Sequence, residues 1–277
     1  MSDSTERIAP ARAVEPRALQ DGGHARPSKV PEITLLFWII KIAATTLGET
    51  GGDAVSMSMQ LGYLVGTLIF AVIFVLAVTV QIRMHRFHPL PYWTTIIATT
   101  TVGTTLADFA DRSLGIGYAG GSTLLLSLLL VSLWAWRRTL GSVAVDSVVT
   151  PRAEAFYWVT IMCSQTLGTA WGDWVADAPG LGYGSAALLF GSLLLGLAAL
   201  QRWSQVSRTV LFWAAFVLTR PLGAVVGDFL DKPIDAGGLA LSRYAASAVL
   251  LLVIVVLTLS FRQRPAPSCV DGVRARR

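Results

Sequence analysis

The chain has 277 residues, of which 53% are hydrophobic and only 14% charged, and its formal net charge is +5. A soluble globular domain typically carries about 25% charged residues, so the composition argues against an ordinary cytosolic enzyme. Two isolated cysteines and three histidines outside the apolar stretches leave no material for a zinc cluster or a disulfide framework. The basic residues stand between apolar segments, which is typical of a polytopic membrane protein and not of a nucleic-acid-binding protein.

Apolar stretches long enough to cross a bilayer recur over residues 31–262, which we predict to be a transmembrane domain. The preceding residues 1–30 are polar and rich in Arg, Pro and Gly, and they are predicted to form a disordered cytoplasmic arm. The basic tail over 263–277 is also predicted to be cytoplasmic. In chain order, the eight expected spans are 32–52, 61–82, 91–109, 115–136, 154–174, 181–201, 209–229 and 239–261.

Positive charge alternates between the loops. Arginines gather in the arm, after each even-numbered span and in the tail, whereas Arg112 and Lys232 on the other side each stand close to an aspartate. By the positive-inside rule, this pattern places both termini in the cytoplasm. We therefore expect an all-α integral membrane protein with eight transmembrane helices, located in the inner membrane of a bacterium.

The odd-numbered spans share one pattern, Trp-x9-Gly-x4-Asp, which occurs four times. Each repeat is predicted to be a helical hairpin, and the four tandem hairpins, over 32–82, 91–136, 154–201 and 209–261, enter the membrane in parallel. Parallel entry predicts pseudo-rotational symmetry about the membrane normal, unlike the inverted repeats of many transporters. The glycines are expected to let helices approach closely and the tryptophans to anchor at the membrane interface. The repeated residues are Trp38, Trp93, Trp158 and Trp213; Gly48, Gly103, Gly168 and Gly223; and Asp53, Asp108, Asp173 and Asp228.

Positions 7, 8, 11 and 15 residues after each tryptophan form one polar stripe on a helix that turns by about 100° per residue. Polar groups facing lipid would be left unsatisfied, so the four stripes must face one another or water. We predict that they line an acidic axial pathway for a cation, with the four repeated aspartates as candidate metal ligands. The fourth repeat departs from the pattern with Arg220, Pro221 and Ala224. The other stripe residues are Thr45, Thr46, Glu49, Asp53, Thr100, Thr101, Thr104, Asp108, Gln165, Thr166, Thr169, Asp173 and Asp228.

Further charged residues lie beside the stripe. Two cations within spans, Lys41 and Arg220, are expected either to pair with a carboxylate or to gate the pathway. Glu49 is the deepest carboxylate and the best candidate partner of Arg220, provided that spans 1 and 7 are neighbours. Three aspartates one turn beyond the stripe are predicted to form an acidic vestibule at the periplasmic mouth, unless each of them only caps a turn. They are Asp111, Asp177 and Asp231.

Three segments of the chain are similar to those of a known family. They are Thr-Leu-Gly-Glu-Thr-x-Gly-Asp, a Tyr-Trp pair before Thr-Thr-x-Gly-Thr, and Thr-x-Pro-Leu-Gly-Ala-x3-Asp. Over about residues 32–262, the chain resembles a family of small bacterial proteins described as uncharacterised and membrane-anchored. The resemblance implies an integral membrane protein of bacteria. It implies no active site and no substrate, so the function has to be inferred from the stripe.

The leading hypothesis is an inner-membrane transporter or channel for a small cation, with the lipid bilayer around it and no nucleic acid partner. Carboxylate and hydroxyl oxygens suit hard divalent cations, of which Mn²⁺ is the first expectation, while protons and monovalent cations stay open. One alternative is a non-transporting scaffold or accessory subunit, whose stripes only hydrogen-bond one another. Another is a Mg-dependent membrane enzyme acting on a lipid phosphate, for which Asp173 and Asp177 have a suitable spacing. No nucleophile–histidine pair supports an enzyme, so no catalytic residue and no permanently bound cofactor is predicted, and the oligomeric state stays open.

Overall fold

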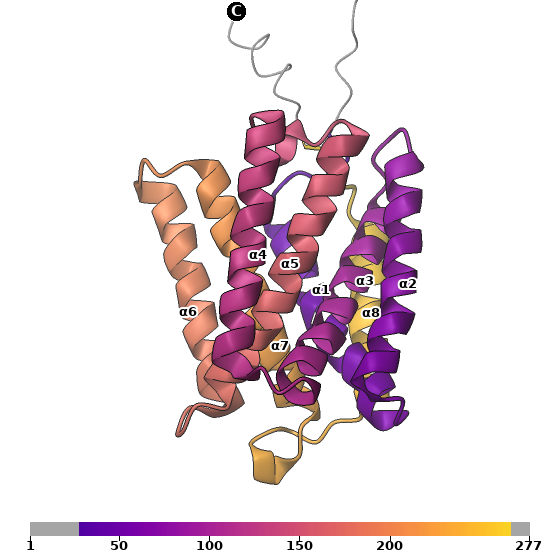
Figure 1. The fold of residues 1–277 in the computed structure, drawn as a ribbon. Coiled ribbons are helices and arrows are strands. Elements are labelled where there is room, and N and C mark those ends of the chain that lie inside the picture. Colours follow the sequence, from indigo (N-terminus) through magenta and orange to yellow (C-terminus); the bar gives the residue numbers. More distant parts are fainter. Residues whose placement is uncertain (1–27, 267–277) are drawn as a thin grey trace, which may run out of the picture.

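The computed structural model describes residues 28–266, so the predicted arm and tail lie outside the described residues except for their inner ends. Within this range the chain is helical, and it contains no β-structure beyond one isolated bridge between Pro31 and Pro265. Short π-helices over Ala54–Ser58 and Phe109–Ser113 extend the first and third helices. The eight α-helices in this range (Figure 1) are α1 (Leu35–Asp53), α2 (Gly62–Arg83), α3 (Pro89–Asp108), α4 (Gly117–Leu140), α5 (Pro151–Ala176), α6 (Gly182–Trp203), α7 (Arg208–Asp231) and α8 (Arg243–Ser260).

The helix ends follow from local side-chain chemistry. Thr34 precedes α1 and Thr150 precedes α5, and each threonine hydroxyl accepts a hydrogen bond from a backbone N–H of the first turn. Proline occupies the first position of α3 and of α5, where its missing N–H removes no helical hydrogen bond. Gly141 ends α4 in the left-handed conformation, with φ of 77°, which a glycine adopts without strain.

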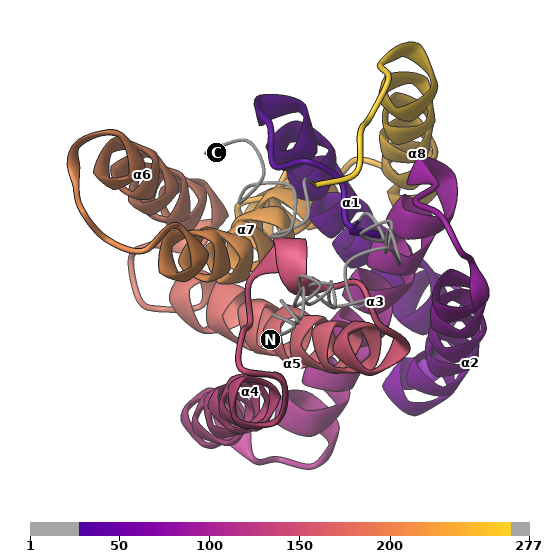
Figure 2. The ribbon, with the colours of Figure 1, turned by 90° about the horizontal axis from the view of Figure 1, so that it is seen from above.

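The four odd-numbered helices form a closed ring. Helix α1 packs against α3, α3 against α5, α5 against α7, and α7 against α1. Figure 2 shows this ring from above, with the even-numbered helices at the outside. Aromatic residues from the starts of all four odd helices contact one another, and aspartates from their ends share counter-ions, so the four helices run parallel.

Each even-numbered helix packs against the odd-numbered helix of the following repeat. Helix α2 packs mainly against α3, α4 against α5, α6 against α7, and α8 against α1, whereas the two helices of one repeat share few contacts. The expected hairpins are therefore open, because the odd helices bind one another closely and leave each even helix to cover the odd helix of the following repeat. The return of α8 to α1 closes the arrangement.

Five of the described helices, α2, α4, α6, α7 and α8, are long and apolar enough to cross a membrane. Helices α1, α3 and α5 carry most of the polar stripe, and the ring buries these polar side chains. The outer helices expose large apolar side chains, such as Leu188 and Leu195 of α6, which are 76% and 74% exposed. An apolar exterior around a polar interior is what a protein surrounded by lipid requires.

The described inner ends of the predicted arm and tail pack against the starts of the odd helices. Lys29 pairs with Glu154 of α5 at 2.6 Å, and Val30 is buried. The backbone N–H of Ala266 donates to the carbonyl oxygen of Val30, and that of Glu32 donates to Arg264. These contacts bring the two ends of the helical domain together.

Candidate functional site

An aromatic layer fills the end of the ring at which the odd helices begin. The hydroxyls of Tyr92 and Tyr157 lie 2.7 Å apart, and both side chains are buried. The sequence predicts the four tryptophans as interfacial anchors, but Trp93, Trp158 and Trp213 are buried. They face into the bundle because each packs against the aromatic residue that precedes it and against aromatic residues of neighbouring segments.

The repeated glycines lie where neighbouring ring helices touch. Each of them faces the residue that follows the tryptophan of the next repeat by seven positions. A Cβ atom on Gly48 would lie 2.2 Å from Oγ1 of Thr100, which is closer than two such atoms can approach. The predicted role of the glycines in close helix packing is therefore confirmed. The equivalent pairs are Gly103 with Gln165, Gly168 with Arg220, and Gly223 with Thr45.

Every stripe residue predicted from the sequence is buried in the structure. Three of the stripe threonines bind neighbouring helices together: Thr100 donates to the carbonyl oxygen of Ala44, and Thr104 to that of Gly48, both on α1. Thr45 donates to a carbonyl oxygen of α7, and the hydroxyls of four other stripe threonines bond within their own helices. The carboxylates are therefore the main candidate ligands. The four threonines that bond within their own helices are Thr46, Thr101, Thr166 and Thr169.

Arg220 binds the deepest carboxylate of the stripe. Its Nη2 atom lies 2.9 Å from Oε2 of Glu49, and it also donates to the hydroxyl of Thr104. The side chains of Arg220 and Glu49 are 0% and 3% exposed, so this ion pair is fully enclosed. Because α1 and α7 are neighbours in the ring, the partner that the sequence predicts for Arg220 is confirmed.

Lys41 differs from Arg220 in having no carboxylate partner within the described residues. Its Nζ atom is buried, has no hydrogen-bond partner, and lies 4.3 Å from the centre of the Phe216 ring. The expectation that Lys41 pairs with a carboxylate is therefore wrong. Glu49, the deepest carboxylate, is two turns further along α1 and already bound by Arg220.

Two cations from the far end of the ring fold back onto the repeated aspartates. Arg112 and Lys232 each follow a repeated aspartate by four residues, and each bridges two repeats. Burial of the Lys232 ammonium opposes its charge, but Asp228 and Asp53 outweigh this effect and hold its pKa well above the usual value. Sequence reasoning missed these bridges, although the spacing of four residues is a signal for them. The four contacts are Arg112–Asp108 at 2.9 Å, Arg112–Asp173 at 3.4 Å, Lys232–Asp53 at 2.8 Å and Lys232–Asp228 at 3.0 Å.

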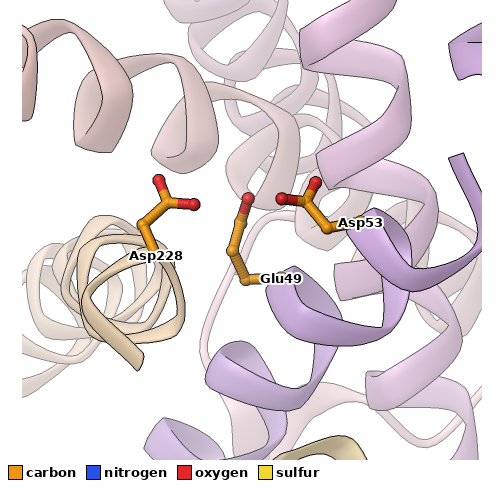
Figure 3. Close-up of side chains that lie close together, drawn as sticks. All are labelled: Glu49, Asp53 and Asp228. Carbon is orange, nitrogen blue, oxygen red and sulfur yellow. The ribbon is translucent and has the colours of Figure 1, made fainter. Parts of the chain in front are cut away.

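Three carboxylates come together into a cluster, which we call the acidic triad: Glu49, Asp53 and Asp228 (Figure 3). One oxygen from each lies within 4.8 Å of the others, and all three residues are buried. Glu49 and Asp53 are one turn apart on α1, and Asp228 is on the adjacent α7. Of the four aspartates predicted as metal ligands, the triad contains two, while Asp108 and Asp173 bind Arg112 instead.

The predicted vestibule residues have separate contacts. Asp177 accepts a hydrogen bond from the hydroxyl of Tyr118, and Asp231 pairs with Nε of Arg243 at 2.8 Å. Asp111 packs against α4. Asp111 and Asp177 therefore both contact α4. Of the three, Asp231 is the one linked to the acidic triad, because Arg243 also lies 3.8 Å from Asp53.

A family model described as Repeat of Unknown Function (DUF347) matches the chain four times, over residues 36–87, 91–142, 156–207 and 211–264. The chain belongs to this family. The DUF347 matches coincide with the four repeats predicted from the sequence, and the resemblance to an uncharacterised repeat family is confirmed. Each DUF347 repeat supplies one ring helix and one outer helix. Neither the curated proteins nor the solved structures contain a match to the chain.

Proposed function

We propose that the protein carries a hard divalent cation, with Mn²⁺ as the first expectation, along the axis of its helical ring. The observation that carries this proposal is the acidic triad, in which three buried carboxylates present oxygens to one another. Oxygen ligands of this kind suit Mg²⁺, Ca²⁺ and Mn²⁺ rather than soft metals. Three buried like charges would repel strongly without a cation between or beside them.

Two side chains of the protein act as stand-ins for the transported cation. Arg220 neutralises Glu49, and Lys232 neutralises the triad aspartates. Lys232 is the displaceable one, because its side chain is 13% exposed and follows the end of α7, whereas Arg220 is fully enclosed. A lysine ammonium on a flexible chain moves readily, while an arginine held by several hydrogen bonds does not. Lys232 thus opens the site to an arriving cation, and Arg220 limits how deeply the cation enters.

We also infer that all eight helices cross the inner membrane of a bacterium, with both termini in the cytoplasm. The polar helices α1, α3 and α5 can do so because the ring and the outer helices shield their stripes from lipid. The arginine-rich connections follow the even-numbered helices, at the end of the bundle where the odd helices begin. The positive-inside rule supports this orientation.

A scaffold without transport is the second candidate, and specific contacts favour it. The stripe threonines donate to backbone carbonyls, and Arg112 already neutralises two of the aspartates. In a scaffold the axis stays closed, whereas a transporter opens it to water. The enzyme alternative gains no such support, since Asp173 contacts Arg112 and Asp177 contacts Tyr118.

Replacing single aspartates by asparagine tests the transport proposal. Asp53→Asn and Asp228→Asn each remove a ligand charge from the triad, and we expect Mn²⁺ uptake into proteoliposomes at limiting Mn²⁺ to fall at least about tenfold. Asp108→Asn and Asp173→Asn are matched controls, because they change the same group on equivalent positions that bind Arg112. They are expected to reduce uptake only severalfold. Equal losses in all four variants would contradict the triad as the binding site.

A further inference from the structure

The three lysines of the chain have different surroundings. Lys29 pairs with Glu154 at 2.6 Å, and Lys232 bridges the two aspartates of the acidic triad. Lys41 has neither a carboxylate nor any hydrogen-bond partner in the described part of the chain, and it is 0% exposed. A charged ammonium there would lack both water and a counter-ion.

The groups that face Lys41 do not compensate a positive charge. On α7, the Phe216 ring lies against Nζ, and Arg220, one turn further along the same helix, carries a positive charge that would repel an ammonium. On α1 itself, Glu49 is occupied by Arg220. The ionisable side chains of α3 are Tyr92, which bonds to another tyrosine, and an aspartate at the far end of the helix. Helix α8 carries Arg243 and Tyr244 at its first two positions, close to the end of α1 and away from Lys41.

Burial without a partner favours the neutral form of a lysine. Removing an ammonium from water costs several kcal/mol, and the face of one aromatic ring recovers only part of this. With Arg220 and Glu49 balancing each other, a neutral Lys41 leaves the enclosed middle of the ring without net charge. A protonated Lys41 is compatible with a ring that has opened and admitted water.

From this geometry we propose that Lys41 is the proton-carrying residue that couples cation movement to a proton, an inference that rests on the proposed transport function. When the ring opens, the lone pair of Nζ forms an N–H bond with a proton from hydronium in the admitted water, the O–H bond of the hydronium breaks to leave water, and the amine becomes an ammonium. Before the ring closes, the N–H bond breaks, the electron pair stays on nitrogen, and the proton returns to water. The charge on Lys41 repels a cation at the triad, so proton and cation bind alternately and are exchanged across the membrane.

The protonation state of Lys41 can be measured without any transport assay. In the purified full-length protein, in detergent micelles and labelled with lysine carrying ¹³C at Cε, NMR resolves amine from ammonium for three residues. Lys41→Met removes one signal and so assigns it. We expect Lys41 to be an amine at pH 7 while Lys29 and Lys232 are ammonium groups. An ammonium signal from Lys41 would overturn the proposal, and a change of that signal on removal of chloride would assign the site to an anion instead.

A transport measurement then tests the coupling. In proteoliposomes, an imposed pH gradient is expected to drive Mn²⁺ uptake by the wild type, and Lys41→Met should retain downhill uptake but lose its dependence on the gradient. Lys41→Arg fixes a positive charge on α1 about two helical turns, or roughly 11 Å, from Glu49 of the triad. It should lower uptake roughly tenfold, because a unit charge at that distance and an effective dielectric constant of about 20 repels the cation by about this factor. Ile161→Met, a change without charge at the equivalent position of α5, is the control and should keep the gradient dependence.

The two proposals can fail separately in these experiments. Wild-type uptake that ignores the pH gradient would overturn proton coupling and leave cation transport standing. If protein from a preparation whose NMR spectrum shows it to be folded takes up no Mn²⁺ into liposomes under any gradient, both the transport function and the coupling are overturned. An amine signal together with gradient-dependent uptake, lost only in the Lys41 variants, supports both.

Discussion

Arg220→Gln is expected to lower the free energy of unfolding by about 3–5 kcal/mol, because it leaves Glu49 as a buried charge without a counter-ion. The lost guanidinium also leaves the hydroxyl of Thr104 with one partner fewer. Denaturant unfolding of the purified protein in detergent, followed by tryptophan fluorescence, measures this loss. The effect should be among the largest of any single substitution, since both side chains of the pair are enclosed by the ring.

The double variant separates pairing from other consequences of the substitution. Glu49→Gln alone should also be strongly destabilising, because it leaves Arg220 as a buried charge without a counter-ion. Combining Glu49→Gln with Arg220→Gln removes both charges together and should recover most of the lost stability. Free energies that add strictly in this cycle would show that the two side chains do not stabilise each other.

The substitution Gly223→Ala is expected to destabilise the protein by about 1–3 kcal/mol, a typical cost of overpacking. The added Cβ would lie 2.2 Å from Oγ1 of Thr45 and 2.9 Å from the backbone carbon of that residue, so α1 and α7 must move apart. A rotation of the threonine side chain cannot relieve the backbone contact. The same unfolding measurement reports the change.

Gly191→Ala provides the matched control for this prediction. Gly191 lies on the outer helix α6, and a Cβ atom there would meet nothing within 4 Å. Alanine is the better helix former, so this variant should be neutral or slightly more stable. If Gly223→Ala behaved like Gly191→Ala, the ring would not depend on close contact at its glycines.

Sequence periodicity predicted those parts of the fold that are properties of a single helix. The stripe could be found because polar side chains in a membrane helix must avoid lipid, and the repeat placed Gly48 and Gly223 on equivalent faces. The partner of Arg220 could be found because Glu49 is the deepest carboxylate of the stripe. In each case the constraint acts on one helix face, which the helical period defines.

Other features depend on which helix lies next to which, and periodicity does not carry this information. The sequence alone did not indicate that α2 leaves its own repeat to cover α3, or that the tryptophans face the interior. Their position between spans marks Arg112 and Lys232 only as loop charges, whereas in the structure they bridge aspartates of neighbouring repeats. Pairing of Lys41 with a carboxylate was the ordinary expectation for a buried charge, and here Arg220 occupies the carboxylate in question.

Water access to the axis tests the central claim, that the ring is a cation pathway and not a closed scaffold, most directly. Single cysteines replace Thr46 or Thr101, which are 2% and 4% exposed in the structure, in a chain whose Cys163 and Cys269 are serine. A membrane-impermeant, water-soluble thiol reagent is applied from each side. Ile234→Cys, in an exposed connection, is the positive control, and Leu195→Cys, on the apolar exterior, is the negative control. The proposed pathway predicts that both stripe cysteines are labelled and that Mn²⁺ slows the reaction; unlabelled stripe cysteines beside a labelled Ile234→Cys would contradict it.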